Sequence, residues 1–235
     1  MTQPKDPANS ISTETQISML DSQLSTQELL QRYQDALSDI DKTTSPLAWA
    51  KASLDVAEAL LTLERQAEAW QQARPALDIF LQHKHWQEAV ETCNVLFQTE
   101  QDGAITALGH GVWLAVSFPI EADTSVAMLH HIVDETPPDS DGAAVAAATA
   151  KYIAELRTSG DKQDSLLFLT NHILGQVAQR HSGITDQASF DQWIKRLQLN
   201  EPAVLLPKLG QVLEVMVDNR WWFDKDRLRA EMPED

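Results

Sequence analysis

The sequence contains only one cysteine and lacks any long hydrophobic run. Because Cys93 stands alone, an intramolecular disulfide bond is excluded, which is consistent with a reducing compartment. No segment approaches the roughly 18 apolar residues of a membrane-spanning helix. Residues 1–24 lack the basic start and the continuous apolar segment of a signal peptide. We therefore expect a cytoplasmic protein that does not insert into a membrane.

Common catalytic signatures are missing as well. The chain has no GxSxG nucleophile motif, no Walker phosphate-binding loop and no GxGxxG dinucleotide-binding motif. Cys93 lies inside an apolar helical pattern, where a thiol packs rather than attacks a substrate. These absences favour a binding function over catalysis.

The chain also has a long stretch without positively charged residues. No lysine or arginine occurs between Lys84 and Lys151, although the formal net charge of the whole chain is -17. The titratable residues of this gap are Glu88, Glu91, Glu100, Asp102, Glu121, Asp123, Asp134, Glu135, Asp139 and Asp141, with His85, His110, His130 and His131. An extended negative field repels nucleic acid and attracts basic surfaces or cations. We expect a partner protein with a basic surface, and no binding of nucleic acid.

What the sequence does contain is a succession of helical patterns. Apolar residues recur every three or four positions, and no alternating strand pattern of comparable length competes. The predicted helices span about 25–40, 46–63, 66–82, 86–99, 103–118, 123–135, 141–157, 161–180, 186–197 and 201–219. Ser25 and Glu28 have capping-box spacing, whereas Pro75 either kinks or divides the third helix. The predicted fold class is all-α, built from antiparallel helical hairpins.

Composition divides the chain into three parts. Residues 1–24 are rich in Ser, Thr and Gln and have too few apolar residues to offset the entropy of ordering, which predicts a disordered tail. Residues 25–219 form the predicted helical domain. Residues 220–235 form an aromatic and charged C-terminal segment.

Two segments carry small residues at a spacing that allows helices to pack closely. They are Ala69, Ala73, Ala76 and Leu77 in the first, and Trp86, Ala89, Cys93, Leu96 and Phe97 in the second. The pattern resembles the second helix of tetratricopeptide-like repeats over about residues 46–98. The two copies are closer together than the family period of about 34 residues, and Ser53 and Ala57 depart from the first-helix pattern. The resemblance implies a repeat-like array of helical hairpins, with an irregular helical bundle as the alternative.

Four carboxylates surround the predicted break near residue 137, namely Asp134, Glu135, Asp139 and Asp141. The first two lie at a helix end, where the helix dipole disfavours negative charge. A basic partner would compensate for this charge, and the next helix start would do so too. We expect these four residues to contact a partner, or else to belong to a solvated connector.

In the C-terminal segment, Trp221, Trp222 and Phe223 are consecutive, so one helix face cannot hide all three. At least one of them should be exposed or bridging. Because aromatic residues are enriched at binding hot spots, the three are candidate docking residues. The alternative is that they fold back and cover the end of the last hairpin.

The expected function is a non-enzymatic protein-binding module, such as an adaptor, chaperone or assembly factor, that needs no cofactor. The alternative is a metal-dependent enzyme or a metal-handling protein. His130 and His131 precede Asp134 and Glu135 by one helical turn, which places each imidazole beside a carboxylate that a divalent metal accepts. No HExxH or CxxC motif accompanies them.

Overall fold

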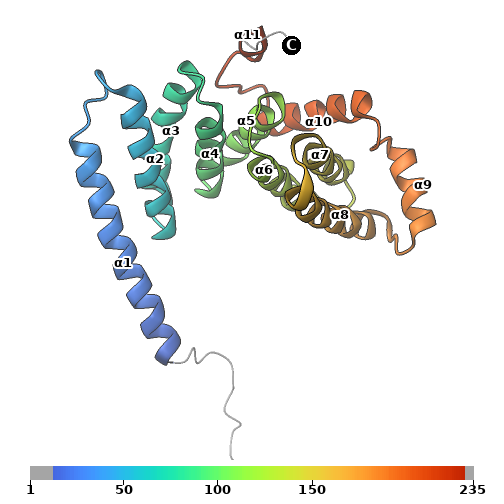
Figure 1. The fold of residues 1–235 in the computed structure, drawn as a ribbon, viewed down its shortest axis with the longest axis horizontal. Coiled ribbons are helices and arrows are strands. Elements are labelled where there is room, and N and C mark those ends of the chain that lie inside the picture. The colour runs from blue at the N-terminus through green and yellow to red at the C-terminus, as the bar shows by residue number, and fades with distance from the viewer. Residues whose placement is uncertain (1–12, 231–235) are drawn as a thin grey trace, which may run out of the picture.

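The computed structural model of the chain describes residues 13–230, with side chains from residue 25 onward. This part of the chain folds into eleven α-helices and no strand, so the all-α prediction is confirmed (Figure 1). The helices are α1 (Thr13–Ser38), α2 (Pro46–Thr62), α3 (Gln66–Gln82), α4 (Trp86–Gln98), α5 (Ala104–Ser117), α6 (Ala122–Glu135), α7 (Asp141–Arg157), α8 (Gly160–Ser182), α9 (Gln187–Leu197), α10 (Pro202–Val217) and α11 (Lys225–Ala230). None of these helices is long and apolar enough to cross a membrane.

Consecutive helices pack against each other throughout the first two thirds of the chain. Each helix from α1 to α7 contacts the one that follows, and short turns join them, so neighbours run antiparallel. Helices two positions apart also meet, because α2 contacts α4, α4 contacts α6 and α6 contacts α8. This packing is consistent with a helical repeat, as the small-residue pattern implied.

Two glycines allow α5 to lie in the middle of this array. A Cβ atom at Gly111 would lie 2.8 Å from Cys93 Cβ, and one at Gly109 would lie 2.6 Å from Val217 Cγ2. Both distances are too short for real carbon atoms, so only glycine permits α4 and α10 to approach α5 this closely. Cys93 is fully buried at this contact, as expected for a packing thiol.

After α9 the chain turns back, and α10 packs on α5 and α7 (Figure 1). The contact is made by the apolar stripe Leu205, Leu209, Leu213 and Val217, which is buried. Local periodicity predicts this stripe but does not identify its partners. The return of α10 brings the C-terminal segment next to the turn between α4 and α5.

The predicted helix start at Ser25 is wrong. Helix α1 begins at Thr13 and passes through Ser25 without a break, so the capping-box spacing there lies inside a helix. The expected disordered tail, residues 1–24, is therefore helical in its backbone from Thr13 onward, while residues 1–12 lie outside the described part of the chain. Pro75 also does not divide the third helix, because α3 is continuous across it.

Candidate functional site

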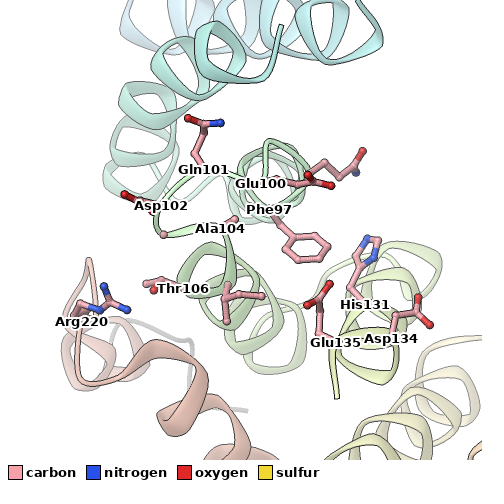
Figure 2. A pocket seen from close by; sticks show the side chains of 13 residues that line it. Phe97, Glu100, Gln101, Asp102, Ala104, Thr106, His131, Asp134, Glu135 and Arg220 are labelled. Atoms are coloured by element: carbon pink, nitrogen blue, oxygen red, sulfur yellow. The ribbon is translucent and has the colours of Figure 1, made fainter. Parts of the chain in front are cut away.

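A cleft of about 990 Å³ opens where α4 ends, α5 begins and α6 ends (Figure 2). We call it the acidic cleft. It is lined by Phe97, Gln98, Glu100, Gln101, Asp102, Gly103, Ala104, Ile105, Thr106, His131, Asp134, Glu135 and Arg220. Two of the predicted partner-binding residues, Asp134 and Glu135, therefore lie on its wall beside Phe97 and His131.

Negative charge dominates the acidic cleft. Glu100, Asp102, Asp134 and Glu135 contribute four carboxylates, whereas Arg220 contributes the single guanidinium of the lining. The carboxylates of Glu100, Asp102 and Glu135 have no hydrogen-bond or ion-pair partner within residues 25–230. The carboxylate of Asp134 lies 3.9 Å from His130 Nε2, a distance at which the interaction is weak. The cleft consequently presents three carboxylates that form no ion pair within the described residues.

The turn between α4 and α5 fixes the direction of two of these side chains. Glu100 has a positive φ of 54° and Gly103 one of 98°, and the hydroxyl of buried Thr99 donates to Leu96 O at 2.7 Å. The turn is thus tied down from within, while Glu100 and Asp102 remain exposed. Because α4 and α6 both end here, their terminal carbonyl groups add negative partial charge to the cleft. The N-terminal end of α5 adds a positive partial charge that offsets part of it.

His131 does not supply a compensating charge. Its Nε2 donates to Asn94 Oδ1 at 3.0 Å, and its ring lies 4.8 Å from that of Phe97. Burial, with a smaller contribution from His130, lowers the pKa of His131 below its usual range, although Asp134 opposes the shift. The imidazole is therefore neutral near pH 7 and fastens α6 to α4.

The four residues of the metal hypothesis do not converge. Within the described residues no three His, Cys, Asp or Glu side chains are placed to share a metal ion. His131 is hydrogen-bonded to Asn94, and only His130 and Asp134 approach each other, at 3.9 Å. The one-turn spacing places His130 beside Asp134 on the surface of α6, and it does not assemble a set of metal ligands.

The other two predicted carboxylates lie outside the cleft lining. Asp139 is exposed in the connector after α6. Asp141 begins α7, and its Oδ1 lies 3.1 Å from His181 Nε2 of α8. The connector reverses the chain direction, so Asp139 and Asp141 lie away from the cleft although Asp134 and Glu135 are close to them in sequence.

The predicted docking aromatics lie against the helical array. His110, fully buried in α5, accepts the backbone N–H of Trp222 at Nε2 with a distance of 3.1 Å. Its ring is 5.0 Å from Trp221, 4.5 Å from Trp222 and 5.0 Å from Phe223. All three aromatics are half-buried. The segment is thus fastened to α5, and a docking role for it stays a prediction.

A second set of contacts joins the same segment to α3. Trp70 meets Trp222 edge to face at 6.1 Å, and the guanidinium of Arg74 lies 4.4 Å from the centre of the Trp222 ring. Burial, followed by the charges of Arg74 and Lys225, lowers the pKa of His110 to about 3. His110 therefore remains neutral. Since Nε2 accepts a hydrogen bond, the proton is on Nδ1, for which residues 25–230 provide no acceptor.

Sequence reasoning placed Glu100 and Asp102 in the acidic region without assigning them to a site. The available signal was their position between two apolar helices, since a short turn brings its carboxylates to a helix end.

No protein-family model, curated protein or solved structure matches this chain. The geometry of the cleft is therefore the basis for any functional assignment. Its chemistry is that of a surface for cations, since it presents unpaired carboxylates beside helix C-terminal ends.

Proposed function

We propose that this protein binds a cationic segment of another protein in the acidic cleft, as an adaptor, chaperone or assembly factor does. The observation that carries the proposal is the unpaired state of Glu100, Asp102 and Glu135 around one cavity. Opposite charges that face each other across an interface accelerate encounter and fix register. Lysine or arginine side chains of a partner would neutralise these carboxylates.

The helical array supports the same proposal. We infer that the antiparallel hairpins belong to a repeat-like module of the tetratricopeptide type, in which stacked helices form an extended surface. Outside the cleft, α2 carries Asp55 and Glu58, and α4 carries Glu91. Burial raises the pKa of Glu58, and the neighbouring charges of Asp55 and Glu91 raise it further, so these three carboxylates repel one another. Lys51 of α2 pairs with Glu88 of α4 at 3.0 Å.

The test is binding of a short labelled peptide of alternating lysine and serine, here called the probe peptide. The variant Glu100→Gln/Asp102→Asn/Glu135→Gln removes the three unpaired carboxylates. All three side chains are exposed, so the variant breaks no buried contact. We expect it to bind the probe peptide about tenfold more weakly, since each exposed ion pair contributes about 0.2–1 kcal/mol.

A matched control keeps the total charge change the same. Asp39, Glu64 and Asp164 are exposed and lie outside the cleft. The variant Asp39→Asn/Glu64→Gln/Asp164→Asn should bind the probe peptide nearly as well as the original chain. Equal losses in both variants would mean that only net charge matters, and the assignment of the cleft would then be wrong.

A further inference from the structure

A second pocket, of about 560 Å³, adjoins the acidic cleft, because Ile105 and Glu135 line both. We call it the apolar pocket. Its lining is Ile105, Glu135, Thr136, Pro137, Ser140, Gly142, Val212, Val215 and Met216. It therefore lies between the start of α5, the connector from α6 to α7, and the outer face of α10.

The apolar pocket contains side chains that the core leaves uncovered. Val215 is 81% exposed and Ile105 is 40% exposed, although α10 buries a separate apolar stripe against α5 and α7. Single exposed apolar residues are ordinary on protein surfaces. Here, however, two of them share one concavity with Val212, Met216 and Pro137. Apolar side chains in a concavity are typical of a surface that receives an apolar group.

Charge decides what kind of molecule fits across both cavities. Glu135 lines both cavities, and Glu100 and Asp102 line the acidic cleft together with Ile105. An occupant that fills the apolar pocket therefore presents its neighbouring groups to carboxylates. Basic groups gain from this placement, and acidic groups are repelled.

We propose that the apolar pocket receives a large apolar side chain of a partner segment whose lysine or arginine residues engage the acidic cleft. The inference rests on the proposed function and adds a second requirement to it: the recognised segment is amphipathic, with an apolar anchor next to its basic residues. Burial of one such side chain corresponds to about 10- to 100-fold in affinity.

Other occupants fit the charges less well. A second copy of this chain carries the same net charge of -17, so the two copies repel each other. The parts of the chain outside the described residues are 1–12, in which Lys5 is followed by Asp6, and 231–235, which has three acidic residues and no basic one. Neither supplies the cationic partner that the cleft requires.

Selection from a displayed library of short random peptides tests the inference on the full chain. Enriched peptides should combine basic residues with at least one large apolar residue. The variant Val215→Asp places a carboxylate in the apolar pocket at a highly exposed position, so folding is preserved. It should weaken the enriched peptides by about tenfold or more, because their apolar side chain loses its site.

The matched control is Phe168→Asp on α8, since Phe168 is 79% exposed and lies outside both cavities. This variant should bind the enriched peptides as the original chain does. Equal weakening by Val215→Asp and Phe168→Asp would overturn the inference.

The remaining outcomes separate the two proposals. If enriched peptides are basic but bind Val215→Asp unchanged, the apolar anchor is refuted while the cationic function stands. If enriched peptides are apolar, depend on Val215 and lack basic residues, the pairing of the two cavities is refuted. If no basic peptide is enriched and the probe peptide also fails to bind, the proposed function falls, and the inference falls with it.

Discussion

Lowering the pH from about 7.5 to about 5 should destabilise the folded protein through His110. This side chain is fully buried in α5, and its Nε2 accepts the backbone N–H of Trp222 at 3.1 Å. A second proton would remove that acceptor and place a charge in the core close to Arg74 and Lys225. Burial and these two cations accordingly lower the pKa of His110 to about 3.

The sign follows from the two pKa values of His110. The unfolded chain binds a proton with a pKa of about 6.5, whereas the folded chain binds it only near pH 3. Between these values the unfolded state holds more protons, so the free energy of unfolding falls as the pH falls. The contribution of His110 to the free energy of unfolding is complete above about pH 6.5, and about 2 kcal/mol of this contribution is lost at pH 5.

The assay is urea denaturation at both pH values, on the original chain and on His110→Gln. The glutamine side chain does not titrate, and its amide oxygen is a hydrogen-bond acceptor that replaces the ring nitrogen. Carboxylates titrate equally in both proteins, so the difference between their two pH dependences isolates His110. That difference should be about 2 kcal/mol. Identical pH dependences would refute the reasoning, as would an NMR titration that gives His110 an ordinary pKa.

Three further predictions concern packing and charge. Trp222→Ala should lower the free energy of unfolding by about 3 kcal/mol and leave binding of the probe peptide intact; lost binding with unchanged stability would instead identify a docking anchor. Gly111→Ala should cost about 1–3 kcal/mol in urea denaturation, because the added methyl group overlaps Cys93. Burial and then Asp55 raise the pKa of Glu58, so the ionised form is disfavoured in the fold and stability falls as the pH rises through that pKa. Glu58→Gln should therefore stabilise the protein at pH 7 by about 0.2–0.5 kcal/mol, and no gain would show that the repulsion is screened.

Helix positions follow from local chemistry, which is why most of them could be predicted. Helix α6 ends at Glu135, two residues before Pro137, and α7 begins after Ser140, whose hydroxyl oxygen accepts the Gly142 N–H. Proline and capping residues act within one turn of the chain. The predicted helix start at Ser25 is wrong because it rests on local spacing alone. A capping-box spacing also occurs inside a longer helix, and nothing local distinguishes such a position from a true helix start.

Long-range placement could not be predicted from periodicity. The stripe on α10 indicated burial, but its contact with α5 and α7 depends on where the chain turns after α9. The apolar pocket has the same origin, because Ile105 and Val215 are far apart in sequence and line one pocket only through this return.

The lining of the acidic cleft could be predicted only in part. Composition identified the negative region, and Asp134 and Glu135 do line the acidic cleft. Asp139 and Asp141 do not, because the connector carries them to the start of another helix. Proximity along the chain was an unreliable guide to proximity in space at this reversal.

The most direct measurement is an NMR titration of the uniformly labelled protein with the probe peptide. Backbone amide shifts should change in the turn 99–106 and at the end of α6, residues 131–135, and these changes should weaken from about 50 to about 500 mM salt as screening shortens. Shifts confined to another face, such as α8 and α9, would contradict the account. So would shifts in the cleft that remain unchanged in Glu100→Gln/Asp102→Asn/Glu135→Gln.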